Sequence, residues 1–283
     1  MKKLVALFLL LTLLCGCAPA QTNPDTPLFV HFIDVGQADC TLFKWGDIDI
    51  LIDAGDTNDA WLVNSYLTRL GVDDLELVIA THPHADHIGG MSSVLNKFSV
   101  EQIWTNGVFY NTSVAKDLNQ QIEKQNLNLH HPKVGEVHTF GDLQLTVLGP
   151  VRLDYDDINN TSIVVMVQFG EKRFLMTGDM ESVAEAELLD AKTDLKADVL
   201  KVGHHGSYSS SSNAFLEAVD AEFCFIPVGE DNDYGHPHDA AINRLRKAGI
   251  TRFRADTMGN VVVATRGDDL AFFWDAAKVA PAA

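Results

Sequence analysis

The residues with the clearest chemistry lie between Thr81 and His87, where the chain reads Thr-His-Pro-His-Ala-Asp-His. Neutral imidazole and carboxylate groups are ligands for zinc, manganese and iron. Four such groups exceed what one open catalytic site takes from a single loop, so the spacing predicts two metal ions that share the loop. His82 and His84 are expected to face one ion. Asp86 and His87 are expected to face the other. A histidine-rich surface loop or a closed structural zinc site is the simpler alternative.

Further ligand-like residues follow two other apolar runs. The run Phe174–Thr177 leads to Asp179, and the run Asp198–Val202 leads to His204. Strand ends that converge on one side of a sheet form a site, so we expect Asp179 to bridge two metals and His204 to complete the second. Asp179 could instead cap the helix that follows it, but the upstream cluster favours a ligand role.

The elements that position these residues alternate along the chain. Short apolar runs predict strands, and apolar residues at helical spacing predict helices. The expected strands are Phe29–Asp34, Cys40–Lys44, Ile48–Asp53, Leu75–Ala80, Val100–Thr105, Val137–Phe140, Leu143–Leu148, Ser162–Phe169, Lys172–Thr177, Ala197–Val202, Glu222–Val228, Thr251–Ala255, Asn260–Thr265 and Leu270–Trp274. The expected helices are Asp59–Leu70, Ile88–Lys97, Ser113–Gln125, Glu181–Ala191, Asn213–Val219 and Asp239–Ala248, and Asn126–Glu136 reads as a loop. Two strand-rich halves with helices predict stacked sheets with helices outside.

The N-terminal segment reads as a secretion signal. Lys2 and Lys3 precede the apolar run Leu4–Leu14, which is too short for a membrane span of ~20 residues and fits a signal peptide. Leu-Cys-Gly-Cys follows and resembles a bacterial lipobox, with Cys17 as the lipidated residue; an ordinary signal peptide is the alternative. We therefore expect residues 1–16 to be a signal peptide, 17–27 a lipidated tether, and 28–283 the folded domain. The protein would be an extracytoplasmic, membrane-anchored lipoprotein.

Composition narrows the remaining possibilities. Cys40 and Cys224 lie in apolar runs far apart in sequence, so they are expected to be buried, reduced and structural. Formal net charge is -18 at pH 7, which opposes unaided binding to nucleic acid. Bound metals supply positive charge locally, so a nucleic-acid substrate stays open.

Taken together, the motifs resemble those of metallo-β-lactamase-fold hydrolases, and within them the metal-binding domain of ComEC-type DNA-uptake proteins and secreted phosphorylcholine esterases. The resemblance extends over residues 28–265. It rests on His31–Asp39, Ile50–Gly55, His82–His87, Asn159–Ser162, Thr177–Asp179, Lys201–Ser207 and Tyr234–His238.

The resemblance implies an α+β fold, a four-layer αββα sandwich with a dinuclear site of zinc or manganese between the sheets. It assigns His82 and His84 to the first metal, and Asp179 to a bridging position. The implied ligands of the second metal are Asp86, His87 and His204. Asn160 stands where the wider superfamily has a third histidine for the first metal, and an amide oxygen is a harder, weaker ligand than imidazole.

The site so implied supports metal-assisted hydrolysis, since a metal lowers the pKa of a bound water to ~7. Asp53 is expected to orient a ligand histidine. His236 and His238 are the candidate catalytic residues, to protonate a leaving group or bind an oxyanion. His205 is expected either to support a metal ligand or to be exposed. The histidines without a motif are expected to be structural or exposed: His31, His130, His131 and His138.

Four functions are compatible with these observations. The leading one is an extracytoplasmic phosphodiesterase or nuclease of ComEC-like type, acting on a small or polymeric phosphodiester, with DNA as a candidate and competence as its setting. A phosphorylcholine or teichoic-acid esterase at the cell wall is the second. Hydrolysis of a lactone or β-lactam is the third, and a lipoprotein that only binds a ligand is the fourth.

Overall fold

The computed structural model describes residues 26–275, and two mixed β-sheets form its centre. The first sheet has the strand order β17-β16-β1-β2-β3-β5-β7-β8. Its strands are β1 (Leu28–Phe32), β2 (Thr41–Trp45), β3 (Ile48–Ile52), β5 (Leu77–Ala80), β7 (Gln102–Thr105), β8 (Asn128–His130), β16 (Val261–Thr265) and β17 (Ala271–Trp274). The short strands β4 (Asp74–Leu75) and β6 (Ser99–Val100) pair separately.

The second sheet has the order β15-β14-β13-β12-β11-β10-β9. Its strands are β9 (Val137–Phe140), β10 (Leu143–Gly149), β11 (Val164–Phe169), β12 (Lys172–Met176), β13 (Val199–Lys201), β14 (Phe223–Ile226) and β15 (Thr251–Arg254). Side chains from the facing surfaces of both sheets, among them Phe43, Phe174 and Trp104, form one apolar core.

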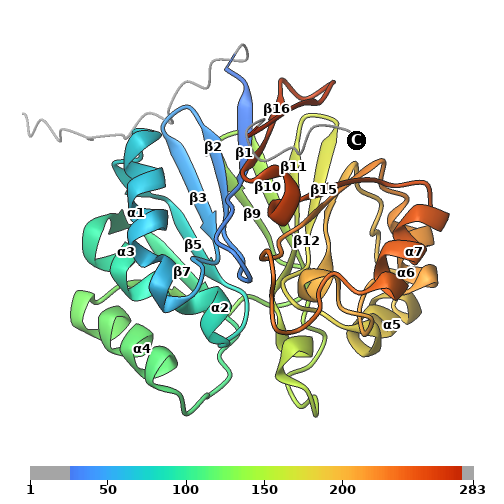
Figure 1. Ribbon diagram of the computed structural model, residues 1–283. Helices are drawn as coiled ribbons and strands as arrows, with labels where there is room; N and C mark the ends of the chain where they lie inside the picture. The colour runs from blue at the N-terminus through green and yellow to red at the C-terminus, as the bar shows by residue number, and fades with distance from the viewer. Residues whose placement is uncertain (1–25, 276–283) are drawn as a thin grey trace, which may run out of the picture.

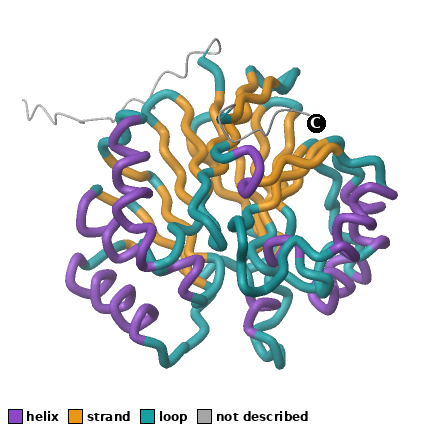
Figure 2. Tube along the Cα trace, in the orientation of Figure 1, coloured by secondary structure: helices purple, strands orange, loops and turns teal. Residues whose placement is uncertain are grey.

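Helices cover the outer face of each sheet (Figure 1; Figure 2). On the first sheet lie α1 (Ala60–Arg69), α2 (Ala85–Ile88), α3 (Met91–Lys97) and α4 (Ser113–Gln125), and on the second α5 (Ser182–Asp190), α6 (Asn213–Val219) and α7 (Asp239–Lys247). The short α8 (Ala255–Met258) and the 3₁₀ turns η1 (Thr57–Asp59), η2 (Ile158–Thr161) and η3 (Gly203–Gly206) complete the list. The predicted four-layer sandwich is confirmed.

Local sequence explains why α4 forms and where it ends. The Thr112 hydroxyl accepts a hydrogen bond from the Ala115 backbone N at 3.3 Å, which caps the first turn. Ala115, Leu118 and Ile122 lie on one face and are buried. The helix ends at Gln125, and Asn126 follows it with a φ of 51°, the left-handed conformation that Asn tolerates.

Parallel strand pairs bring the chemistry to one edge of the sandwich. In the first sheet β3, β5 and β7 are mutually parallel, and in the second β12, β13 and β14 are. The carboxyl ends of parallel strands meet at the same edge of a sheet. The loops after β5, β12 and β13 carry the residues singled out by sequence, so the fold itself gathers them.

Two expected elements differ from the observed ones. The expected loop Asn126–Glu136 contains β8, an exposed three-residue edge strand whose Asn-Leu-His sequence has no apolar run to reveal it. The expected helix Ile88–Lys97 is two helices, because Gly89 and Gly90 lie against the chain before α1. A Cβ on Gly89 would lie 2.2 Å from the Thr57 backbone N.

Cys40 and Cys224 are buried and free, as expected. Burial raises the pKa of the Cys224 thiol to about 12, so this group stays protonated and unreactive at neutral pH. Residues 1–25, which include the expected signal peptide and Cys17, lie outside the described residues. Within the described chain, the helices are all too short or too polar to span a bilayer.

Candidate metal centre

The His-x-His-x-Asp-His cluster occupies the loop after β5 and the single turn of α2. His82 and His87 are buried, whereas His84 and Asp86 are partly open to solvent. The His82 Nε2 and His84 Nδ1 atoms lie 3.0 Å apart, and the rings of His82 and His87 have centroids 4.2 Å apart. The four side chains therefore converge, as the sequence predicted.

Asp53, at the end of β3, orients His87. Its Oδ2 accepts a hydrogen bond from His87 Nδ1 at 2.7 Å, and its Oδ1 accepts one from the Thr81 backbone N at 2.9 Å. This pairing leaves His87 Nε2 directed at the cluster. Metal-binding histidines are commonly oriented in this way, by a carboxylate that accepts the hydrogen bond of the other ring nitrogen. Asp53 holds a φ of 57°, a conformation that is uncommon outside glycine and concentrates at functional sites.

Asp179 lies at the centre of the group. Its Oδ1 is 3.3 Å from His87 Nε2, and its Oδ2 is 3.6 Å from His205 Nε2 and 3.9 Å from His204 Nε2. Ser162 Oγ accepts a hydrogen bond from the Asp179 backbone N. Gly178 permits this approach, because it has a φ of 51° and a Cβ there would lie 2.8 Å from the Ser162 Cβ. Asp179 therefore faces the cluster and does not cap α5.

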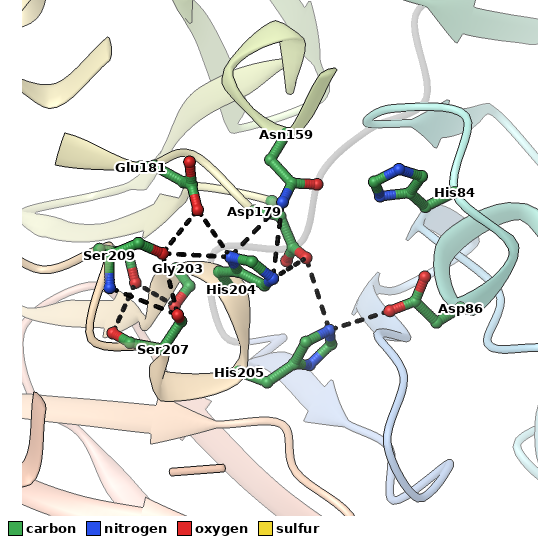
Figure 3. Close-up of polar contacts among 12 residues, drawn as sticks. His84, Asp86, Asn159, Asp179, Glu181, Gly203, His204, His205, Ser207 and Ser209 are labelled. Atoms are coloured by element: carbon green, nitrogen blue, oxygen red, sulfur yellow. Dashed lines mark hydrogen bonds and ion pairs between the residues drawn. The ribbon is translucent and has the colours of Figure 1, made fainter. Parts of the chain in front are cut away.

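Both histidines of η3 reach the cluster (Figure 3); the sequence indicated His204 but not His205. His205 is 2% exposed; its Nδ1 donates to the Pro227 carbonyl at 2.8 Å, and its Nε2 lies 3.1 Å from Asp86 Oδ2. His204 is more open and its Nδ1 lies 3.1 Å from Glu181 Oε1. His205 is therefore buried rather than exposed, and its fixed Nδ1–H aims Nε2 at the carboxylates. Both residues have left-handed backbone angles.

Asn160, the asparagine of η2 expected near the first metal, points away from the cluster, and its neighbour Asn159 points toward it. The Asn160 amide oxygen accepts hydrogen bonds from the Glu181 backbone N at 3.1 Å and the Ala184 backbone N at 3.4 Å. It therefore caps the start of α5, and this geometry does not favour Asn160 as a ligand. Asn159 faces the cavity instead, with Nδ2 3.5 Å from the His204 ring nitrogens (Figure 3).

The residues present fit a metal. His87 Nε2, Asp179 Oδ1 and Asn159 Oδ1 are buried without a hydrogen-bond partner. Buried polar atoms are nearly always paired, so unpaired atoms directed at one space indicate a ligand there. Asp86, His87, Asp179 and His205 each offer a ligand atom, and these atoms lie within 4.8 Å of one another.

Charge at the cluster also favours a cation. Burial opposes protonation of His87, but Asp179, Asp53 and Asp86 outweigh it and raise its pKa well above the usual range. Burial likewise opposes ionisation of Asp179, yet His87 and His205 hold the pKa of its carboxyl well below the usual value. The Asp179 carboxylate thus stays ionised and attracts positive charge, whether from protons or from metal ions.

A buried ion pair supports the cluster from beneath. Lys201 at the end of β13 pairs with Asp39, and both side chains are at most 6% exposed. The Lys201 Nζ also donates to the Gly178 carbonyl at 2.6 Å and lies 3.6 Å from Asp179 Oδ1. The pair therefore links the loop after β1 to the loop that carries Asp179.

The cluster opens into a cavity of about 580 Å³ whose lining includes His84, Asp179, Tyr110, Tyr234 and His236. His236 is one of the two expected catalytic residues and lies inside this cavity. The other, His238, accepts a hydrogen bond from the Tyr208 backbone N at 3.1 Å at the start of α7. The structure thus separates their positions.

Comparison with known proteins agrees with this geometry. Residues 33–223 match the model of the family described as the metallo-beta-lactamase superfamily. The chain belongs to the metallo-beta-lactamase superfamily. With its buried His/Asp cluster, it is a metal-dependent hydrolase of that superfamily.

Named relatives of this superfamily member are bacterial competence proteins. It is 30% identical over 251 residues to ComE operon protein 3 of Bacillus subtilis, which covers 82% of this chain and 32% of that protein. It is 28% identical over 241 residues to competence protein ComA of Neisseria gonorrhoeae, covering 84% and 32%. The chain thus spans about a third of the length of these relatives, and the relationship to ComEC-like proteins is distant.

Among solved structures, the metallo-beta-lactamase fold protein YhfI from Bacillus subtilis aligns with a TM-score of 0.55 at 15% identity. The alignment covers 85% of this chain and 100% of that one. At this identity the likeness shows the fold alone.

Proposed function

We propose that this hydrolase is a phosphodiesterase whose substrate carries aromatic groups, with single-stranded DNA as the leading candidate. The observation that carries the proposal is the pair of tyrosines that line the cavity, one beside His84 and one beside His236. The Tyr234 ring stacks on His236 at 5.7 Å and is 69% exposed, and the Tyr110 ring stands 5.7 Å from His84. Aromatic rings beside a centre that cleaves phosphodiester bonds can stack on the bases of a single nucleic-acid strand.

The similarity to competence proteins supports the same class of substrate. A protein of net charge -18 would bind a polyanion mainly through bound cations and stacking, because few Lys and Arg contacts to phosphate are available. We propose two divalent ions, zinc or manganese. His82, His84 and Asn159 would hold one, and Asp86, His87 and the η3 histidines the other, with Asp179 between them.

Such ions would act as Lewis acids and supply an ionised water at neutral pH. The residues of the chain keep the geometry: Asp53 fixes His87, and the Pro227 carbonyl fixes His205. The amide oxygen of Asn159 is a harder ligand than imidazole. It would therefore help the ion held by His82 and His84 to be manganese.

The hydrogen-bond pattern around His236 supports a role as a hydrogen-bond donor to the substrate. The Gly229 backbone N donates to Gln37 Oε1 at 3.1 Å, so the Gln37 amide nitrogen must face His236 Nδ1, also at 3.1 Å. Nδ1 therefore accepts, and the proton of the neutral ring resides on Nε2. Asn232 fixes the loop by bonding the His236 backbone N and carbonyl. We propose that His236 Nε2–H donates a hydrogen bond to the negative charge that develops on the phosphate oxygens.

His236→Ala is expected to retain bound metal and lose ~10²–10³ in kcat, the usual effect of one oxyanion donor. The loss should be similar for p-nitrophenyl and alkyl leaving groups, because a neutral donor does not protonate the leaving group. His238→Ala is the matched control and should lose much less. Steady-state kinetics with metal analysis checks this; equal losses in both variants would contradict it.

A substrate panel tests the function itself. The metal-loaded protein should cleave bis-p-nitrophenyl phosphate and a single-stranded DNA oligonucleotide. Aromatic rings also bind quaternary ammonium groups, so a phosphorylcholine ester is the second candidate. Turnover of that ester alone would transfer the function to cell-wall esterase. Turnover of nitrocefin or a lactone without any phosphodiester would assign it to carbonyl hydrolysis.

We also propose that the chain is an extracytoplasmic lipoprotein anchored through Cys17, on the sequence pattern alone. Cys17→Ala should release the protein from the membrane fraction or stall its processing, because stable anchoring needs the acyl chains. Cys15→Ala is the matched control and should leave fractionation unchanged. Membrane fractionation with immunoblotting measures both, and an unchanged Cys17→Ala variant would refute the anchor.

A further inference from the structure

A second group of metal-binding side chains lies where the chain passes from the first sheet to the second. β8 is the outermost strand of the first sheet, and β9 is the outermost strand of the second. His130 ends β8, Glu136 immediately precedes β9, and His138 belongs to β9. None of these three residues belongs to the cluster around Asp179.

The three side chains converge on one point. Glu136 Oε2 lies 2.6 Å from His130 Nε2 and 3.0 Å from His138 Nε2. The two imidazole rings have centroids 5.5 Å apart, and the three ligand atoms all lie within 4.8 Å of one another. Each side chain is between 27% and 33% exposed, so the group is half-sheltered and reachable from solvent.

The buried ring of Trp104 on β7 forms the inner wall of the group. Its centroid lies 4.6 Å from that of His138 and 5.9 Å from that of His130. Trp104 is fully buried in the core between the sheets. The two histidines are thereby held against a rigid apolar surface with their Nε2 atoms turned toward Glu136.

We propose that His130, Glu136 and His138 form a second metal site that takes one zinc-class divalent cation and joins the edges of the two sheets. Two imidazoles and one carboxylate with an exposed fourth position are a common zinc ligand set. Zinc–ligand bonds of ~2.0–2.2 Å place tetrahedral ligand atoms roughly 3.3 Å apart. The observed separations of 2.6 and 3.0 Å therefore need only a small expansion.

The position of the group explains what the ion does. At the opposite ends of the sheets, β15 and β17 are held together by the stacked rings of Phe253 and Phe272, 4.6 Å apart. The β8–β9 end has the His-Glu-His group beside Trp104. A cation there links the two edge strands through coordination bonds to its ligands and stabilises the sandwich without entering the reaction. This inference does not rest on the proposed function.

Zinc titration of the full chain tests the site, with bound metal measured by elemental analysis after dialysis. Glu136→Gln and His138→Ala should each bind one zinc equivalent fewer than the wild type. Their affinity for that ion should fall by more than ~100-fold, since loss of even an outer partner of a ligand costs ~10–100-fold. His131→Ala, beside the site and exposed, is the matched control and should bind as the wild type does. Equal zinc binding in all four proteins would overturn the proposal.

Copper provides a second, spectroscopic readout of the same site. Cu²⁺ bound to His130 and His138 should quench the fluorescence of Trp104 at low stoichiometry in the wild type. The quenching should be absent in Trp104→Phe and in Glu136→Gln.

Saturating zinc should also raise the thermal midpoint of the wild type by about 5–10 °C more than that of Glu136→Gln. Wild-type quenching that Trp104→Phe leaves unchanged, or no difference in the zinc-induced shift, would show that the three residues are only a surface hydrogen-bonded triad.

Discussion

Asp179→Ala is expected to lose bound metal and hydrolytic activity together, with activity down by at least ~10³-fold. Asp179 is 1% exposed and its two oxygens lie within 3.3–3.9 Å of three histidines. In the proposed dinuclear centre, its removal would take away a ligand shared by both ions, a larger loss than the ~10–100-fold caused by removing an outer partner. Elemental analysis and turnover on bis-p-nitrophenyl phosphate measure both effects.

Asp156→Ala serves as its control, because Asp156 is an exposed carboxylate on the loop that leads into η2. It should keep both metal and activity. If Asp179→Ala kept wild-type metal content, the bridging position assigned to Asp179 would be wrong even if activity fell.

Lys201→Met is expected to lower the free energy of unfolding by ~3–5 kcal/mol, the usual cost of leaving one partner of a buried pair unpaired. Asp39 would remain buried without its cation, and the Gly178 carbonyl would lose its donor. For a domain of this size, each kcal/mol shifts the thermal midpoint by ~2–4 °C. Urea unfolding of metal-free protein measures the effect without interference from bound ions.

Two further variants test whether the loss of stability comes from the Lys201–Asp39 ion pair. Lys196→Met removes an ion pair with Asp220 whose side chains are 69% and 71% exposed, and it should cost no more than ~1 kcal/mol. Adding Asp39→Asn to Lys201→Met should recover part of the loss, because the uncompensated charge is then gone. Equal stability of the Lys201 and Lys196 variants would show that the buried pair contributes little.

The pH dependence of this contribution follows from the Lys201 pKa. Burial opposes the charged form, but Asp39 and Asp179 outweigh it and raise the pKa above its usual value. A raised folded-state pKa of a base stabilises the fold below the unfolded value of ~10.4 and ceases to do so as pH rises through the folded value. The difference between wild type and Lys201→Met should therefore be constant near neutral pH and shrink in strongly alkaline solution.

The metal-binding motifs could be predicted from sequence because their ligand-type residues are closely spaced or directly follow apolar strands. The four residues of the His82–His87 cluster share one loop, and Asp179 follows an apolar strand, so parallel strand ends predicted their meeting. The αββα sandwich followed from the alternation of strands and helices together with the family resemblance. β8 escaped prediction because an exposed edge strand of three residues has neither an apolar run nor strict alternation.

Choices between neighbouring residues could not be predicted from sequence. His204 and His205 are adjacent, and only their left-handed backbone angles turn both toward Asp179. Asn159 and Asn160 sit on one 3₁₀ turn, where a single residue step decides which side chain faces the cavity and which caps α5. The pairs Asp39–Lys201 and Gln37–His236 join residues more than 150 positions apart, and no local pattern indicates them.

Anomalous X-ray diffraction from crystals of the manganese- or zinc-loaded protein tests the central claim most directly. Two peaks are expected in the cavity, one beside His82 and His84 and one beside Asp86, His87 and His205, with the Asp179 carboxylate between them. A single peak, or none within bonding distance of these side chains after metal loading, would contradict a dinuclear centre at this edge of the sandwich.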